Sequence, residues 1–331
     1  EEAVSKQRDH HDRFPAHASL ACRQSFLDRP IVDEYVEILW AAMRRLWPRL
    51  ERKPRRSSTI VTCDVDHPYH PSAASVPRLI KRTAAEVIRK RTFSSGIHPL
   101  KNYMAARRGN WRNDVYYYTV DWMMDVNEKA GNKVAFYFIP EITDAKYDGA
   151  CTVADPAVKE MLGRIARRGH EIGIHPGYNT YRSQVNLGSA VNALRRVLDR
   201  QHINQEIGGG RQHFLRWSTH TPAIWDRAGL RYDSTLSFAD YAGFRCGTCH
   251  EYPMYDLHHR SALKVRQRPL ICMEQSVIRY MGYGLTEQAL EAMQKLKKVV
   301  YRYHGDFVLL WHNSCFEADR AREMYCEVIR S

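Results

Sequence analysis

The chain has 331 residues, of which 44% are hydrophobic, and this supply of apolar side chains excludes an intrinsically disordered protein. No apolar run reaches the ~20 residues needed to cross a bilayer, so no transmembrane helix is predicted. Lysine and arginine number 50 against 37 acidic residues, and the resulting charge of +13 favours an anionic partner.

Much of the excess positive charge lies in two clusters, Arg44–Arg56 and Lys81–Arg91. Each cluster is typical of a solvated helix face, and equally of a surface that attracts acidic glycans or lipid phosphates. No nucleic-acid-binding motif accompanies them, so nucleic acid is not expected as a partner. The clusters instead suggest a peripheral contact with a membrane.

Cysteine usage and the N-terminus bear on location. Eight cysteines are scattered through mostly apolar segments, which is typical of reduced, buried thiols. Cys246 and Cys249 form a CxxC pair without the second pair that a four-cysteine zinc site needs, so this pair is not predicted to bind metal. The first thirty residues are charged and lack the apolar core of a secretory signal. We therefore expect a cytoplasmic protein, at the inner face of the membrane.

The predicted elements begin after an aperiodic arm, residues 1–30. Apolar residues then recur at three- and four-residue steps from Ile31 to Leu46, which predicts an amphipathic helix ending near Trp47. A basic linker, residues 51–56, leads to a short buried strand, residues 58–63. We place the boundary of the main domain here: 1–56 is an arm with an amphipathic helix, and 57–331 is the domain itself.

Strands alternate with helices over the rest of the chain. Residues 71–132 are predicted to be mainly helical. Cap and glycine signals predict helices at about 155–169 and 221–229, and apolar periodicity predicts others around 191–198 and 286–303. Six further strands are predicted, at 133–139, 170–175, 209–213, 230–234, 270–274 and 307–311. This alternation predicts an α/β fold with a parallel sheet, and seven strands favour a barrel.

Polar residues end several of these strands. Asp64 and Asp66 follow the first strand two residues apart, so they share a face and can bind a cation or share a proton; a strand-end turn is the alternative. His175 and His312 follow two other strands. Because the carboxyl ends of the strands share one face of a β/α barrel, we expect these four residues to lie together.

Three more residues are candidates for the same site. Arg211 can hold a carboxylate, and His213, on the same face of its predicted strand, can bind metal or donate a proton. Asn179 lies four residues after His175, where a helical turn would place both on one side as metal ligands.

Taken in chain order, these motifs resemble those of the NodB-homology polysaccharide deacetylases. The resemblance rests on Thr62–Asp66, Gly169–His175, the strand at Arg211, and Leu310–His312, and it covers about residues 57–320. The segments 211–216, 232–236 and 239–248 are similar to a divergent branch found with surface-polysaccharide genes, such as those for O-antigens or capsules.

The resemblance implies a distorted (β/α)7-type barrel, with the N-terminal helical part as an extension, and one divalent metal, usually zinc. It implies that Asp64 is the base and Asp66 a metal ligand, although the two can be exchanged, and that His175 is a second ligand. Asn179 stands where the family has a second histidine, so His213 is the candidate replacement.

The resemblance also implies that Arg211 holds the base and that His312 is the general acid. We further predict that Trp311 and Tyr178 contact the substrate. The expected activity is removal of an N-acyl group from a sugar of a bacterial surface polysaccharide, with an anionic or lipid-linked glycan as substrate. A metal-free glycan-binding barrel and hydrolysis of another C–N bond, such as that of an amide or imide, are the alternatives.

Overall fold

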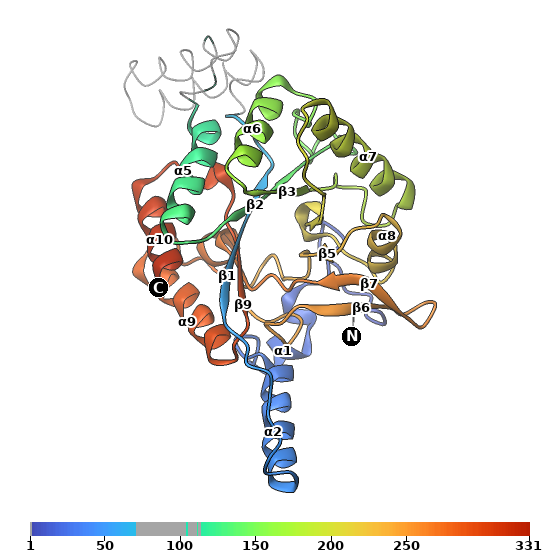
Figure 1. Ribbon diagram of the computed structural model, residues 1–331, viewed down its shortest axis with the longest axis vertical. Helices are drawn as coiled ribbons and strands as arrows, with labels where there is room; N and C mark the ends of the chain where they lie inside the picture. Colours follow the sequence, from blue (N-terminus) through green and yellow to red (C-terminus); the bar gives the residue numbers. More distant parts are fainter. Residues whose placement is uncertain (1, 71–103, 105–110, 112–113) are drawn as a thin grey trace.

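The computed structural model describes residues 2–70, 104, 111 and 114–331 (Figure 1). Within these residues a single mixed sheet has the strand order β6-β7-β5-β4-β3-β2-β1-β9-β8. The strands are β1 (Ser58–Val65), β2 (Val134–Phe138), β3 (Glu171–Ile174), β4 (Gly209–Gly210), β5 (Tyr232–Asp233), β6 (Tyr252–Asp256), β7 (Ser261–Gln267), β8 (Cys272–Met273) and β9 (Asp306–Leu310).

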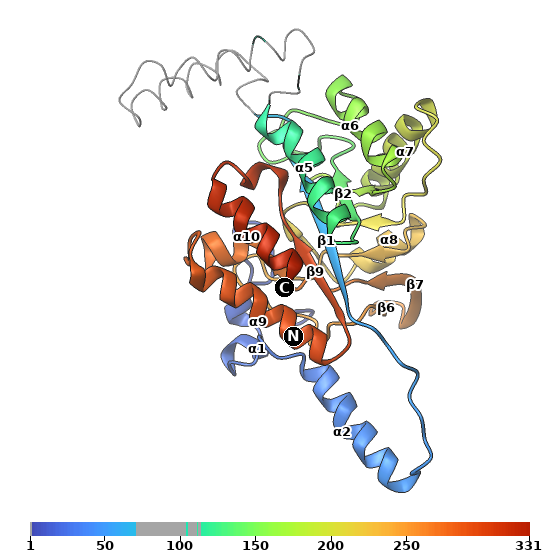
Figure 2. The same cartoon turned by 60° about the vertical axis from the view of Figure 1, so that its left-hand side comes forward.

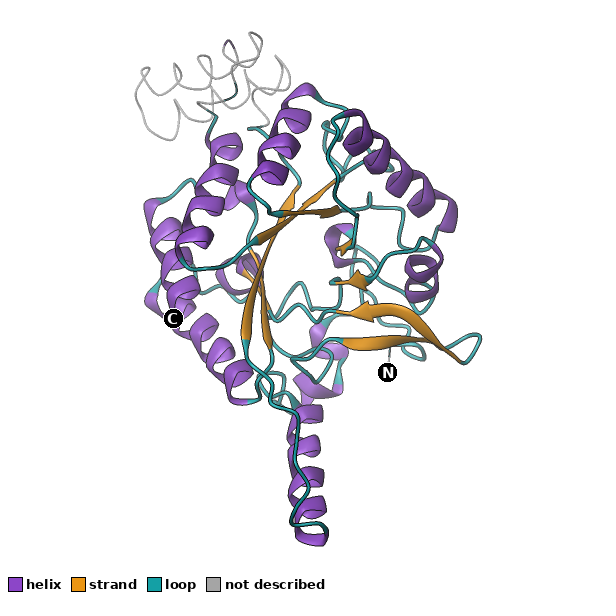
Figure 3. Ribbon diagram, viewed as in Figure 1, coloured by secondary structure: helices purple, strands orange, loops and turns teal. Residues whose placement is uncertain are grey.

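The sheet confirms the predicted α/β class and corrects the number of strands. All seven predicted strands are present and pair in parallel, but β6 and β7 form an antiparallel hairpin that joins the sheet at β5. The hairpin escaped prediction because Pro253 interrupts β6 and no helix separates its strands. The strands curl around a centre and form an incomplete barrel, called the barrel below. No pairing joins β6 to β8 in the described part of the chain (Figure 3).

Helices lie around the outside of the curled sheet (Figures 1 and 2). They are α5 (Val115–Lys129), α6 (Pro156–Arg167), α7 (Gln184–Arg200), α8 (Thr221–Arg227), α9 (Glu287–Arg302) and α10 (Asp319–Arg330), preceded by α1 (Leu20–Arg23) and α2 (Ile31–Leu46). Short helical turns cover Ala16–Ala18, His213–Leu215, Ser276–Tyr280 and Asn313–Cys315. The predicted start of α6 is confirmed, since the Asp155 side chain accepts from the amide of Ala157 and Pro156 follows the cap.

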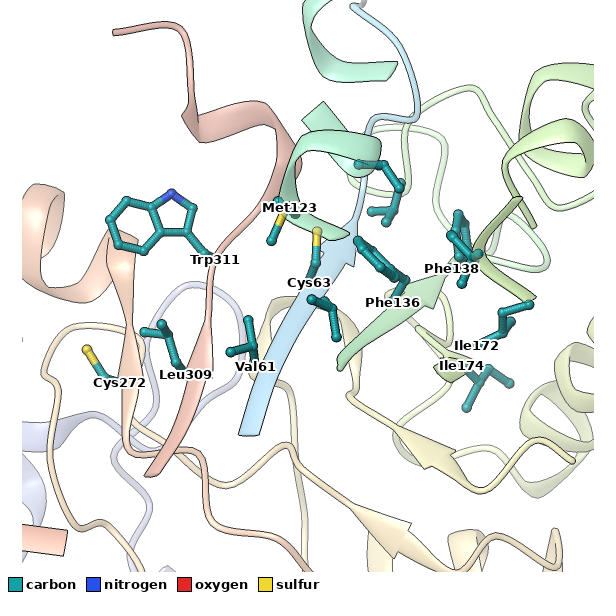
Figure 4. Close-up of a cluster of buried hydrophobic side chains, with 14 of the residues drawn as sticks. Val61, Cys63, Met123, Phe136, Phe138, Ile172, Ile174, Cys272, Leu309 and Trp311 are labelled. Atoms are coloured by element: carbon teal, nitrogen blue, oxygen red, sulfur yellow. The ribbon is translucent and has the colours of Figure 1, made fainter. Parts of the chain in front are cut away.

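The two faces of β1 explain how the fold positions polar side chains. Val61 and Cys63 face outward and pack with neighbouring strand residues against the helices (Figure 4). Because side chains alternate along a strand, Thr62 and Asp64 face inward, toward the centre of the curled sheet. The carboxyl end of β1 therefore delivers a carboxylate to the interior.

The chain before β1 has two differently placed parts. Residues 2–30, the N-terminal arm, lie against the barrel: Phe14 and Leu27, for example, form a buried cluster with Phe238. Helix α2 and the following residues 47–57 instead extend away from the body (Figures 1 and 2). The second predicted basic cluster, Lys81–Arg91, lies outside the described residues.

Close packing between β3 and β4 gives a test of this arrangement. A Cβ on Gly210 would lie 1.8 Å from the carbonyl oxygen of Ile174, whereas a Cβ on Gly188, in α7, would meet nothing within 4 Å. We expect Gly210→Ala to destabilise the protein by at least about 2 kcal/mol. Gly188→Ala should stabilise it by about 0.5–1 kcal/mol because alanine is the better helix former. Urea denaturation of both variants checks this, and equal midpoints would contradict it.

Candidate active site

The predicted site residues converge on one cavity at the carboxyl ends of the strands. Asp64 lies at the end of β1, and His175 and His312 lie just beyond β3 and β9. The cavity measures about 100 Å³ and is lined by these three residues together with Asp66 and His213.

Asp66, His175 and His213 are close enough to hold one metal ion. One ligand atom from each lies within 4.8 Å of the others. Asp66 Oδ1 is 3.1 Å from Nε2 of His175 and 3.6 Å from Nε2 of His213. This oxygen is buried and accepts no well-formed hydrogen bond from the described residues. A carboxylate and two imidazoles are the donor set of a zinc site with an open position, so the residues fit the metal that the resemblance implies.

The charges around Asp66 favour its ionised form. Burial by itself raises the pKa of this carboxyl, but the contact with His175 and the charges of His213 and His312 hold the pKa well below its usual range. An ionised carboxylate is the form that binds a cation.

Both histidines are oriented by a second contact. Nδ1 of His175 lies 2.6 Å from the carbonyl oxygen of Arg211, and because a carbonyl only accepts, this nitrogen donates. In the neutral form of His175 the lone pair is then on Nε2, the nitrogen that lies 3.1 Å from Asp66 Oδ1. Nδ1 of His213 lies 2.8 Å from Asp148 Oδ1, a carboxylate–histidine pair of the kind that supports metal ligands.

Asp148 is a site residue that the sequence analysis missed. It is buried, and its carboxylate also accepts hydrogen bonds from the amides of Thr143, Asp144 and Tyr178. Burial raises the pKa of Asp148, but His213 and the amides of Thr143 and Tyr178 have the larger effect and lower it to about 2. Asp148 lies in an irregular segment after β2, where no periodicity or motif signals a role.

Asn179 takes no part in this cluster. It is exposed; its Nδ2 donates to the carbonyl of Thr143, and its Oδ1 accepts from Nη1 of Arg216. His213 is thus the third side chain of the candidate metal cluster, while Asn179 connects Thr143 to Arg216.

His213 reaches the cavity because the chain turns sharply after β4. The predicted strand 209–213 ends at Gly210, and Phe214 and Leu215 have φ of 58° and 55°. This left-handed conformation costs a non-glycine residue about 1–2 kcal/mol, so surrounding contacts must hold it.

The N-terminal arm supplies some of those contacts. Nη1 of Arg13 donates to the carbonyl of Phe214. Arg216 donates from Nε to the carbonyl of His11 and from Nη1 to that of Tyr178. The arm is therefore bound to the loops that follow both His175 and His213, and Arg13 itself lines the cavity.

Arg211 holds Asp64 inside the barrel. Its side chain is fully buried, and Nη1 donates to Asp64 Oδ1 at 2.7 Å and to Thr62 Oγ1 at 3.0 Å. Nε and Nη2 donate to the carbonyl and hydroxyl of Ser234. The predicted Arg–Asp contact is present, with Asp64 fixed beside the cluster of metal-binding candidates.

His312 is paired with a buried glutamate that the sequence analysis missed. Nδ1 of His312 is 2.6 Å from Glu274 Oε1, and Nε2 is 3.7 Å from Asp66 Oδ2. Burial lowers the pKa of His312, but Glu274, Asp66 and Asp64 together raise it to about 10. In the metal-free protein this imidazole is therefore protonated at neutral pH, as a proton donor requires.

Trp311 and Tyr178, predicted to contact substrate, do not line the cavity. Trp311 is fully buried on the outer side of β9 (Figure 4). Its ring stacks on that of Phe316, with the ring centres 5.5 Å apart. Tyr178 is buried under the N-terminal arm, where its hydroxyl lies 3.0 Å from Nδ1 of His11. Gln275 and Tyr280 line the cavity instead.

The CxxC pair does not form a metal site by itself. Cys249 lies close to Asp33 and His250, and these three side chains could together hold a metal ion. Cys246 does not belong to this group. Both oxygens of Asp33 already accept hydrogen bonds, from the hydroxyl of Thr248 and the amide of Cys249. This carboxylate thus anchors α2 to the barrel.

Comparisons with known proteins identify the fold. A solved candidate polysaccharide deacetylase from Mycobacterium smegmatis matches with a TM-score of 0.51 and 18% identity, over 85% of this chain and 86% of that one. A second, from Bordetella bronchiseptica and involved in O-antigen biosynthesis, matches with a TM-score of 0.35 and 17% identity, over 65% of this chain and 75% of that one. The first match confirms the expected polysaccharide deacetylase fold.

The other comparisons add a unit at the N-terminus. Residues 1–48 match a family model described as a family of unknown function (DUF7033). The search of curated proteins finds no match. No helix in the described ranges combines the length and apolar character needed to cross a membrane.

The geometry predicts which side chain binds the metal. We expect His213→Ala to weaken cobalt or zinc binding by at least about 100-fold, because the site loses one of three ligands. Asn179→Ala is the matched control and should change affinity less than about threefold. Chelator competition and the visible spectrum of the cobalt form measure both variants. Loss of metal in Asn179→Ala with retention in His213→Ala would reverse the assignment.

The His312–Glu274 pair predicts a pH dependence. In the metal-free protein the pKa of His312 is about 10, above its ordinary 6.5. The protonated pair therefore stabilises the fold fully below pH 6.5, and this contribution is lost as the pH rises through 10. Glu274→Gln should bring the pKa of His312 down toward neutrality. Imidazole NMR titration measures this, with exposed His202 as the reference signal; an unchanged His312 titration would refute the role of Glu274.

Proposed function

We propose that the protein is a metal-dependent hydrolase that removes an N-acetyl group from a sugar. The observation that carries this proposal is that two carboxylates in one cavity have different partners. Asp66 faces two oriented imidazoles, while Asp64 is held by Arg211. Such a pair can bind a cation with one member and take a proton with the other.

The chain's own residues divide the remaining work. Asp66, His175 and His213 would hold the ion, which when bound polarises the acyl oxygen and acidifies water. Asp64 accepts the proton of the attacking water, and Arg211 keeps its carboxylate aimed at the cavity. His312 gives its proton to the nitrogen of the breaking C–N bond, and Glu274 keeps that imidazole charged. Acetate and a free amino sugar leave.

The size of the cavity supports a small acyl group. An acetyl group has only three non-hydrogen atoms, so it suits a cavity of about 100 Å³. We propose a surface polysaccharide or its precursor as substrate, on the basis of the sequence resemblance, and an anionic or lipid-linked glycan because of the charge of +13.

The test is acetate release by zinc- or cobalt-loaded protein from a panel of N-acetylated glycans and precursors. We expect Asp64→Asn and His312→Gln each to lower kcat by about 10²–10⁴-fold, because each removes a proton-transfer group. Metal content should persist in Asp64→Asn, since Asp64 is not in the ligand trio. Glu206→Gln, at an exposed ion pair with Arg231, is the control and should keep full activity.

The same panel separates the alternatives. Release from small amides or imides but not from glycans would assign another C–N bond as the target. Metal-loaded, folded protein that binds glycans without releasing acetate would establish a binding barrel. Full activity in Asp64→Asn would overturn the proposed mechanism.

A further inference from the structure

Helix α2 and residues 47–57 form a spur that leaves the barrel and returns to β1 (Figure 2). Its base is anchored, since the amide of Val32 donates to the carbonyl of Gly247 and Asp33 accepts from the hydroxyl of Thr248. Asp33 is the one buried residue of α2. The outer part of the spur therefore faces solvent in the described structure.

The spur exposes an unusual amount of apolar surface. Tyr35, Ile38, Leu39, Leu46 and Trp47 are each between 57% and 70% exposed. The first four of these follow the three- and four-residue steps that place side chains on one face of a helix. Soluble monomers rarely expose contiguous apolar patches of this kind unless the patch contacts something.

The opposite side of α2 faces the returning segment of the spur. The guanidinium of Arg52, on the returning segment, lies 4.6 Å from the ring centre of Trp40 and pairs with Glu37. The returning segment thus contacts the polar side of α2, and no described residue buries the apolar face. By contrast, α6 and α9 bury their apolar residues against the sheet.

Basic side chains surround the outer end of this apolar face. Residues 44–56 contain seven lysines and arginines and a single acidic residue, Glu51. Arg44, Arg45 and Arg49 are exposed beside Leu46 and Trp47. An apolar face beside basic residues is the arrangement of helices that lie in the interface of anionic membranes.

We propose that the spur docks the protein on the surface of an anionic lipid bilayer. Its apolar face would enter the boundary between headgroups and acyl chains, with Trp47 at interface depth, and its arginines would pair with lipid phosphates. Charge argues against parallel pairing with a second copy, because that would bring two strongly basic segments together. The sixteen-residue α2 is also too short to cross the bilayer, so the contact would be peripheral.

Vesicle flotation with the whole chain tests this proposal. The probes are vesicles of equal parts phosphatidylcholine and phosphatidylglycerol, and vesicles of phosphatidylcholine alone. We expect at least tenfold tighter binding to the anionic vesicles, weakening as salt screens the arginines. The double variant Ile38→Asp with Leu39→Asp should lose binding at least tenfold, as should Arg44→Gln with Arg45→Gln.

Val185→Asp is the matched control, since Val185 is 79% exposed on α7, away from the spur. It should bind vesicles like the unmodified protein. All these side chains are exposed, so thermal unfolding and zinc affinity should stay unchanged, which separates this test from that of the hydrolase activity.

Three results would overturn the proposal. One is equal affinity for neutral and anionic vesicles, and another is binding that survives the aspartate substitutions. The third is a dimer in solution that Ile38→Asp converts to a monomer, without vesicle binding by either form. Light scattering detects this last case, which would assign the apolar face to a second copy.

Discussion

The buried guanidinium of Arg211 holds the interior of the barrel together. Its side chain joins β1, through Thr62 and Asp64, to the end of β5, through Ser234. Its main-chain carbonyl also accepts from His175 after β3. A buried charge is costly unless it is paired, and removing one partner of such a pair typically costs about 3–5 kcal/mol. The same residue therefore stabilises the fold and aims the groups proposed for catalysis.

Around this pair, the proposed metal site depends on contacts from outside the barrel. His213 enters the cavity on a left-handed turn that Arg13 and Arg216 hold, and Asp148 sets the orientation of its ring. The N-terminal arm thus contributes to the position of a candidate ligand. Residues 1–48, which match one family model, include both this arm and most of the spur. One N-terminal unit therefore serves the site through its first part and carries the proposed membrane contact in its second.

Much of the inward-facing site follows from local periodicity. Asp64 and Asp66 share a face because side chains alternate along a strand, and β/α topology brings His175 and His312 to the same end of the sheet. The same alternation explains why Trp311 is absent from the cavity. It precedes His312, so it faces the opposite side and packs on Phe316. The residue next to a site residue in a strand is thus a poor candidate for contacting substrate.

By itself, the sequence determined the α/β class, the seven parallel strands and the polar residues at their ends. These depend on short apolar runs and helix signals formed by residues that are close together in the chain. Only the tertiary structure decided that His213 joins Asp66 and His175 while Asn179 binds Thr143 and Arg216. It alone brought Asp148 and Glu274 to their histidines and added the β6–β7 hairpin to the sheet. Asp148 and His213 are 65 positions apart in the chain, and Glu274 and His312 are 38 positions apart. Pairs so distant leave no periodic signal in the sequence.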